Sequence, residues 1–416
     1  MAQLDPKAVL EGRVPGRPPI ALIAGTAVCL FCAVVALGID ALYGGAGFWV
    51  GLVLAILPIP LLVALTLTLD RLEPEPARAL LFSFAWGAGI AVLGALVLNT
   101  LGLLYVTVPI FGEAKGHVVS ATLGAPVIEE SLKGAVLFGL LWFRRNEIDG
   151  FADGIIYAAM VGLGFAMMEN VTYYMRAFDE GGADQLQAVF ILRGLVAPLS
   201  HPLFTSMTGL GVAYAATHRR LQLFAPVLGL LGAMLLHGLW NGATTFGMGG
   251  LAVVYLLDGC VLVVLIVVVA VERRGTVRLI ERYLPTYGGT GLVTPQDIRM
   301  LRAIPSRRAA RRWARAVGGP PAARAMVDYQ LAATELALLH KRAERGVADP
   351  AGSRRAVPPC WTSWPRRARR FCAPRPAARR AAVGAPRAVR FPARPVTRCP
   401  GADRPHAGPP IRLTRG

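Results

Sequence analysis

The chain has 416 residues, 54% of them hydrophobic and only 17% charged, and its mean hydropathy is +0.50. Soluble globular proteins carry more charge and lack repeated apolar runs of bilayer length. The composition therefore excludes a soluble enzyme or binding module and predicts an all-α, polytopic membrane helix bundle. The formal net charge of +19 does not describe this bundle, because residues 354–416 alone contain 16 arginines and one aspartate.

Residues 1–18 are polar and predict a short cytoplasmic segment. The apolar run that follows is too long for the core of a signal peptide, and no small-residue cleavage site closes it, so it predicts a first membrane span. About eight spans are expected in a bundle that covers residues 19–272. They are residues 19–40, 48–69, 79–102, 119–143, 151–175, 188–217, 222–245 and 250–272.

Basic residues in the loops predict the orientation of the bundle. Arginines occur in pairs in alternate loops and at the exit from the last span, at Arg71/Arg78, Arg144/Arg145, Arg219/Arg220 and Arg273/Arg274. The intervening loops carry acidic residues and at most one basic residue each. Because positive residues mark the cytoplasmic side, both termini are expected inside, which agrees with an even number of spans.

Two basic regions follow the bundle. Residues 273–353 predict a helical cytoplasmic extension, in which Thr294-Pro295 is typical of a helix start and residues 325–345 predict a solvated or membrane-surface helix. Residues 354–416 are rich in Arg, Pro and Ala and predict a disordered tail. The charge of this C-terminal region favours contact with anionic lipid, whereas specific nucleic-acid recognition is not expected. The tail composition is also typical of an out-of-frame reading of a GC-rich gene end.

The fourth predicted span carries two adjacent acids and a lysine, Glu129, Glu130 and Lys133, inside an otherwise apolar run. A charge near the middle of a membrane helix is costly, so such residues are rare and usually functional. On a helix the lysine lies three and four positions from the two acids and can neutralise one of them. One carboxylate is left over, although an ion pair with a purely structural role is the alternative.

The next three spans each carry a polar residue at a similar depth: Glu169, His201 and His237. Counting a rise of about 1.5 Å per residue, these side chains and the acids of the fourth span fall between the midplane and the outer leaflet. Each residue alone is more often a polar bridge between helices. Together they predict one functional site in a polar cavity that opens outward.

Two carboxylates and two imidazoles are suited to peptide hydrolysis, which needs an activated water and donors for the oxyanion. Glu130 or Glu129 is expected to activate the water, with Glu169 or His201 orienting it. His237 and Asn241, four positions apart on one helix, are the candidate oxyanion donors. A zinc site is the alternative, with candidate ligands Glu130, Glu169, His201 and His237. No His-Glu-x-x-His helix occurs, so hydrolysis without a metal is the favoured interpretation.

The motifs that carry these residues resemble the PrsW family of intramembrane proteases, within the wider CPBP group that includes CAAX-processing endopeptidases. The matching motifs are Glu129-Glu130-x-x-Lys133, Phe165-x-x-x-Glu169, His201 ahead of Phe204-Thr205, and His237-x-x-x-Asn241, in this order on successive spans. The resemblance covers roughly residues 19–272. It implies a multi-pass protease of the bacterial plasma membrane that cuts a membrane-anchored substrate near its outer face, an anti-sigma factor being the expected type.

The last motif position departs from the resemblance, since the family pattern often has Asp where this chain has Asn241. A neutral amide is a poor metal ligand but a good oxyanion donor. Asn241 therefore favours a metal-independent mechanism in which a glutamate activates the water. A metal-dependent mechanism, as the name metalloprotease given to such families implies, is the alternative. The protease hypothesis predicts that Glu130→Gln abolishes cleavage and leaves the protein inserted. The alternatives are a proton-coupled transporter, which the lack of repeated halves disfavours, and a non-catalytic scaffold that holds a partner helix.

Overall fold

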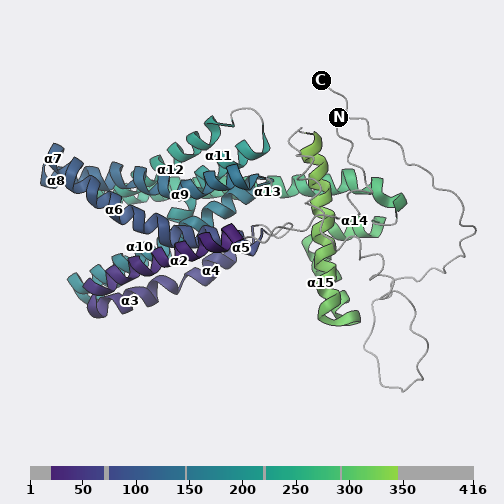
Figure 1. Cartoon of the computed structure of the whole chain (residues 1–416), viewed down its shortest axis with the longest axis horizontal. Coiled ribbons are helices and arrows are strands. Elements are labelled where there is room, and N and C mark those ends of the chain that lie inside the picture. Colours follow the sequence, from purple (N-terminus) through teal and green to yellow (C-terminus); the bar gives the residue numbers. More distant parts are fainter. Residues whose placement is uncertain (1–19, 70–74, 146–147, 219–221, 291–292, 345–416) are drawn as a thin grey trace, which may run out of the picture.

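The computed structural model describes residues 20–69, 75–145, 148–218, 222–290 and 293–344. Every regular element within these ranges is a helix, which confirms the all-α class. Figure 1 shows a bundle of long helices and, at one end of it, a smaller helical extension whose long helix α15 runs across the direction of the bundle. The predicted segments 1–18 and 354–416 lie outside the described residues, as do Arg71 and the pair Arg219/Arg220.

Six helical segments of the described residues are long and apolar enough to cross a membrane, so the predicted count of eight is not confirmed. Two predicted spans are not separate segments in this count. The fourth, now α9 (Ala125–Phe143), carries three charged residues, and the fifth and sixth fall within one helical stretch. The six segments are Ile20–Tyr43, Gly45–Leu67, Ala77–Phe111, Phe151–Thr217, Phe224–Ala243 and Gly247–Gly288.

In the first half of the bundle, short π-helical segments connect successive α-helices into longer helical stretches. Gly112, with a φ of 79°, separates α7 from α8, and both lie at the end of the bundle opposite the extension (Figure 1). The elements are α2 (Ile20–Tyr43), α3 (Gly45–Ile56), α4 (Ile59–Leu67), α5 (Ala77–Trp86), η1 (Gly87–Ala91), α6 (Val92–Gly102), η2 (Leu103–Thr107), α7 (Val108–Phe111), α8 (Glu113–Val119), η3 (Ser120–Gly124) and α9.

The second half contains the most buried helices. Its elements are α10 (Phe151–Phe190), η5 (Ile191–Val196), α11 (Ser200–Thr217), α12 (Phe224–Ala243), η6 (Thr244–Phe246) and α13 (Gly247–Tyr283). Helices α10 and α11 approach closely because glycines face each other: a Cβ built on Gly154 would lie 2.3 Å from the carbonyl oxygen of Gly209. Small residues of this kind let membrane helices pack backbone to backbone.

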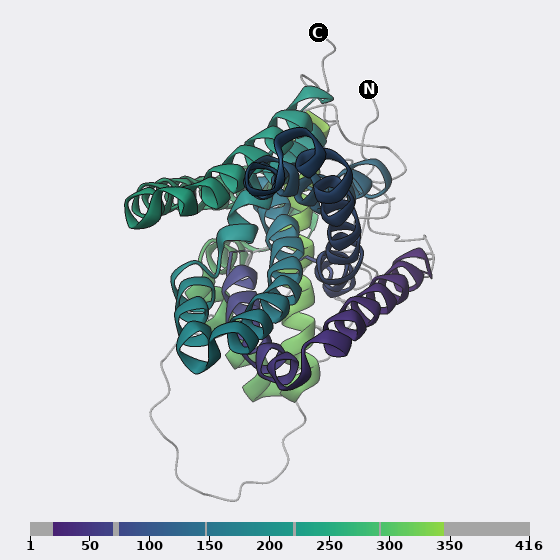
Figure 2. The same ribbon diagram turned by 90° about the vertical axis from the view of Figure 1, so that its left-hand side faces the viewer.

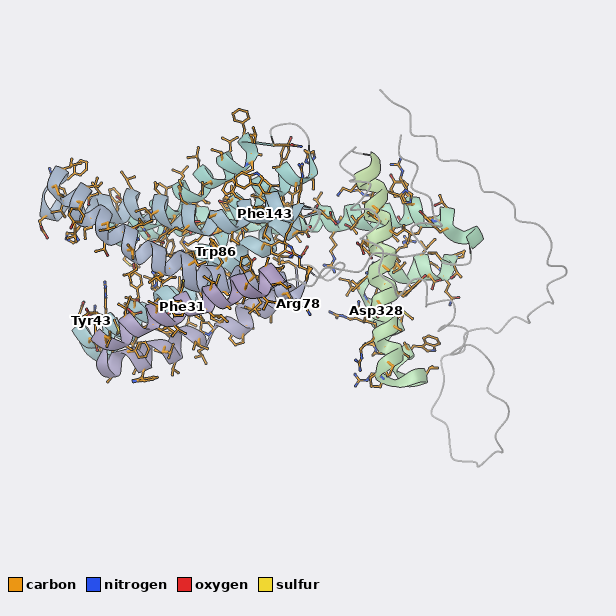
Figure 3. All side chains as sticks on the ribbon, viewed as in Figure 1. Phe31, Tyr43, Arg78, Trp86, Phe143 and Asp328 are labelled. Atoms are coloured by element: carbon orange, nitrogen blue, oxygen red, sulfur yellow. The ribbon has the colours of Figure 1, made fainter. Side chains whose placement is uncertain are left out.

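Apolar side chains cover the outside of the bundle, and Phe31, Tyr43 and Phe143 are 68%, 83% and 87% exposed. Figure 3 shows such side chains along the outer surfaces of the bundle. Figure 2, seen from the end at which α7 and α8 lie, shows α2 in purple at the edge of the bundle. A helix with an apolar exterior of this kind is suited to contact with lipid.

The chain between α10 and α11 differs from the continuous span predicted at residues 188–217. Helix α10 contains a kink at Gly182, where φ is 64°, and the helix that follows ends at Val196. Residues 197–199 are not helical, and α11 begins at Ser200. Pro198 explains the break, because proline lacks an N–H group and its ring obstructs a continuing helix. The Tyr255 hydroxyl donates to the carbonyl of Val196 at 3.0 Å and satisfies one of the freed backbone groups.

The extension consists of the end of α13, η7 (Leu284–Thr290), α14 (Pro295–Leu301) and α15 (Ile304–Glu344). The predicted helix start at Thr294 is confirmed, since its hydroxyl accepts from the N–H of Asp297 at 3.2 Å. Helix α15 bends at Gly319, where φ is 69°. The helix predicted from residue 325 is present within α15, and its apolar face packs inside the extension. Its apolar residues are buried in a core with α13, η7 and α14, formed by Ile280, Leu284, Leu301, Ala332, Ala333, Leu336, Ala337 and Leu339.

Candidate active site

Four consecutive helices bring the predicted polar residues into one cluster. Helix α9 contributes Glu129, Glu130 and Lys133, α10 contributes Glu169, α11 contributes His201 and α12 contributes His237. Glu130 and Lys133 are completely buried, and His237 is 2% exposed. The indole nitrogen of Trp86 donates to the carbonyl of Leu132 at 2.9 Å and fixes α9 against α5 at this level.

Lys133 lies at the centre of the cluster. Its ammonium nitrogen is 2.8 Å from Oε1 of Glu130, 3.5 Å from Oε2 of Glu129 and 3.0 Å from Nδ1 of His201. It also lies 3.7 Å from the centre of the Phe165 ring, a cation–π contact. An ammonium group can only donate, so Nδ1 of His201 is the acceptor. The predicted pairing of the lysine with one acid is therefore present, and the closer partner is Glu130.

Glu130 uses both of its oxygens within the cluster. Oε1 accepts from Lys133 and lies 3.0 Å from Nδ1 of His237, while Oε2 accepts from the hydroxyl of Thr205 at 3.0 Å. Its hydrogen bonds therefore hold α9, α11 and α12 together and orient the imidazole of His237, whose Nε2 is turned toward Glu129.

Glu129 is the carboxylate that remains incompletely bonded. Oε1 accepts from the side-chain amide of Asn99 at 3.2 Å. Oε2 is buried and has no hydrogen-bond partner among the described residues; Nε2 of His237 lies 3.8 Å away. A buried oxygen without a hydrogen bond is costly and calls for an explanation, which a bound group would supply. The sequence predicted one carboxylate left over by the lysine, whereas Lys133 lies within ion-pair distance of both acids and nearer to Glu130.

Glu169 contacts the second ring nitrogen of His201. Its Oε2 is 2.8 Å from Nε2 of His201 and forms an ion pair with Arg193. Since Nδ1 of His201 accepts from Lys133, Nε2 carries the proton and donates to Glu169. Each imidazole of the cluster is thus oriented by a carboxylate, His201 by Glu169 and His237 by Glu130.

Aromatic rings enclose the two imidazoles. The centre of the Phe165 ring is 5.3 Å from that of His201, and Phe204 stacks on His237 at 5.2 Å. The two imidazoles themselves are 5.2 Å apart. Rings packed in this way restrict the rotation of the imidazoles and keep bulk water from the polar atoms, which strengthens the electrostatic interactions among them.

Three residues of the cluster fit a transition-metal ion. Glu129, His201 and His237 offer ligand atoms that all lie within 4.8 Å of one another. Two imidazoles and one carboxylate are typical zinc ligands, and histidine ligands usually donate their other nitrogen to a carboxylate. This set of ligands differs from the predicted set of Glu130, Glu169, His201 and His237. Glu130 is hydrogen-bonded to His237 and Glu169 to His201, and neither is among the three candidate ligands.

Asn241 makes a hydrogen bond outside the cluster. Its amide nitrogen donates to the carbonyl of Ala121 at 2.9 Å and so connects α12 to η3. Its role as an oxyanion donor stays a prediction. The sequence analysis did not assign Asn99, Thr205 or Arg193 to the site. The signal that could have found Asn99 and Arg193 is a polar residue inside a long apolar run.

An apolar helical bundle that encloses three glutamates and two histidines defines a class: a multi-pass membrane protein with an intramembrane acid–imidazole centre. The sequence model of the PrsW family, described as intramembrane metalloproteases, matches residues 75–271. This range contains every residue of the cluster. No solved structure matches the chain.

Three proteins named Protease PrsW are similar to this chain. The Geobacillus kaustophilus protein is 32% identical over 41% of the chain and 69% of its own length. The proteins from Oceanobacillus iheyensis and Clostridioides difficile are 30% and 29% identical, over 36% and 45% of the chain and 66% and 76% of their own lengths. The chain belongs to the PrsW family of intramembrane proteases, which confirms the resemblance and identifies it as a membrane-embedded peptidase.

Proposed function

We propose that the chain is an endopeptidase that hydrolyses a peptide bond of a membrane-anchored protein, with Glu129 as the base that activates water. The observation that carries the proposal is the buried Oε2 of Glu129, which accepts no hydrogen bond from the described residues and faces Nε2 of His237 at 3.8 Å. A water molecule between these two acceptors would donate a hydrogen bond to each, which positions its oxygen for attack.

The reaction needs a group that takes the proton of the water and later returns it, and a group that stabilises the negative charge on the carbonyl oxygen. The water oxygen bonds to the scissile carbonyl carbon while Glu129 takes the water proton. The ammonium of Lys133 lies 3.5 Å from Glu129 and stabilises the developing oxyanion. As the C–N bond breaks, Glu129 passes the proton to the leaving amine. The products are a new carboxyl end and a new amino end.

The same residues would hold a zinc ion through Glu129, His201 and His237. When bound, such an ion would supply a Lewis acid for the water and the scissile carbonyl. The roles of the surrounding residues are then unchanged: Glu130 orients His237, Glu169 orients His201, and Phe165 and Phe204 keep bulk water away.

The proposal includes the orientation predicted from the loop charges, with eight spans, both termini in the cytoplasm of a bacterium and the cut near the outer leaflet. Helix α9 counts as a span because Lys133 pairs with its two acids, which lowers the cost of placing their charges in a membrane. An anti-sigma factor is the proposed type of substrate, in line with the family resemblance. Contact of the basic extension with anionic lipid is part of the same proposal.

The deciding experiment compares E129Q with E130Q in liposomes that contain a reporter protein with one membrane span. E129Q is expected to lower kcat by at least about 100-fold, as expected for loss of a general base, and to lower the melting temperature less than E130Q does, because Lys133 lies farther from Glu129 than from Glu130. E130Q is expected to lower both, since Glu130 connects three helices. E113Q is the matched control, because Glu113 is an exposed acid whose side chain is 82% exposed.

The masses of the reporter fragments locate the cut and test the proposed orientation. An E129Q protein that cleaves at the wild-type rate would exclude Glu129 as the base. Reporter that crosslinks to wild type and is never cut would instead support a non-catalytic scaffold. Loss of activity on chelation that zinc restores would show that the metal is required, with Glu129 acting as its ligand.

A further inference from the structure

We propose that Arg193 is a positioning residue of this centre: it holds Glu169 in place, and Glu169 in turn orients His201. The inference deepens the proposed function and rests on it for the kinetic part of its test. Arg193 lies outside every motif that indicated the family, in the short helix η5 that precedes the break at residues 197–199.

Arg193 makes three contacts with one face of α10. It forms the ion pair with Glu169, its Nε donates to the side-chain oxygen of Asn170 at 2.6 Å, and its guanidinium lies 3.9 Å from the centre of the Tyr173 ring. A planar guanidinium can make all three contacts at once because it combines a rigid set of donors with a flat face. Lysine has the charge but not this geometry.

Arg193 and His201 lie close together in the sequence, and both contact the same oxygen of Glu169. Oε2 of Glu169 interacts with Arg193 and, at 2.8 Å, with Nε2 of His201. His201 lies in the first turn of α11, directly after the break, so the helix before it does not fix its position. Glu169 is therefore the fixed point for the imidazole, and Arg193 is what fixes Glu169.

The expected consequence is a defined orientation of the imidazole. With the charge of Glu169 balanced by Arg193, His201 donates through Nε2 and keeps Nδ1 turned toward Lys133, 3.0 Å away. Without Arg193 the carboxylate loses a charged partner and one of the two contacts that hold its Oε2, so the imidazole is no longer held in one orientation.

The kinetic test uses R193M, R193K and the control R176M. Arg176 is an exposed arginine of α10, about one turn after Tyr173. R193M is expected to lower kcat about 10- to 100-fold, the usual effect of removing a group that orients a functional histidine, with KM within about twofold. R193K is expected to recover part of the loss, and R176M to behave as wild type. An unchanged kcat in folded R193M would overturn the inference. The inference would also be overturned if R193K did not recover the kcat lost in R193M and the loss accompanied a lowered melting temperature. Arg193 would then only stabilise the fold.

A second readout does not depend on catalysis. Nitrogen-15 NMR of histidine-labelled protein reports which nitrogen of His201 carries the proton, with the signal assigned by its loss in H201Q. Wild type is expected to show the proton on Nε2 alone, and R193M a mixture of the two forms. If wild type cleaves no reporter but R193M changes the spectrum, the proposed function fails and the positioning role of Arg193 stands. An R193M spectrum identical to that of wild type would refute the positioning role.

Discussion

Helix α10 carries one carboxylate in its first turn and another in its middle, and the two differ in what bonds to them. Near its start, Asp153 accepts from the backbone N–H groups of Asp149 at 2.6 Å and Gly150 at 2.9 Å. Glu272 of α13 accepts from the N–H of Ala152 at 2.7 Å. These acids satisfy the free N–H groups of a helix start and interact favourably with its dipole.

In the middle of α10, Glu169 is bonded by side chains that come from η5 and α11. Its neighbour in the cluster, Glu129, keeps a buried oxygen that accepts no hydrogen bond from the described residues. Burial alone therefore does not identify a functional acid. An acid that accepts from the backbone of a helix start stabilises that start, whereas acids bonded by imidazoles and cations from several helices form a site. This contrast can be tested by substitutions at these two positions of α10 and in their surroundings.

The largest effect is expected from K133M. This change removes the cation that lies between Glu129 and Glu130, and breaking a buried ion pair typically costs about 3–5 kcal/mol. Thermal unfolding in detergent should show a strongly lowered melting temperature, and cleavage should be lost. K115M is the control because Lys115 is exposed. If K133M melted like wild type, the two carboxylates could not both depend on Lys133.

An intermediate effect is expected from two glycines of α10. A Cβ on Gly162 would lie 2.6 Å from the backbone nitrogen of Pro202, next to His201, and a Cβ on Gly154 would lie 2.3 Å from the carbonyl of Gly209. Overpacking of this kind costs about 1–3 kcal/mol, so G162A and G154A should both lower the melting temperature.

Only G162A should also reduce kcat, because it displaces the start of α11 that carries His201. Gly139 has no atom within 4 Å of its built Cβ, so G139A should change neither quantity. Equal losses of kcat in G162A and G154A would show that the whole α10–α11 interface, rather than its part near the site, controls activity.

The smallest effect is expected from D153A. Loss of an acceptor at a helix start costs about 1 kcal/mol. The kcat should stay at the wild-type value because Asp153 precedes Glu169 by 16 residues of α10, a distance of about 24 Å along a helix. Melting temperature and reporter cleavage measured on the same preparation check this. A loss of activity larger than the loss of stability would remove the contrast between the two acids of α10.

The sequence analysis anticipated the residues of the cluster better than their bonding. A charge inside an apolar run is rare because the membrane makes it costly, so Glu129, Glu130, Glu169 and the two histidines could be singled out one by one. Asn99 and Arg193 follow the same rule and were not assigned to the site, because neither belongs to a recognisable motif. The orientation of Asn241 toward Ala121 depends on the path of η3, which no local pattern predicts.

The sequence by itself determined the all-helical class, the family and the set of acids and imidazoles that meet, because apolar runs, charges within them and their order along the chain are local properties. Only the tertiary structure decided which carboxylate keeps a free oxygen. Glu129 and Glu130 are adjacent and chemically identical, and they differ in the partners that other helices present to them: Asn99 on one side, Thr205 and His237 on the other. The break before His201 and the place of Arg193 were decided in the same way, by contacts between segments that the sequence separates.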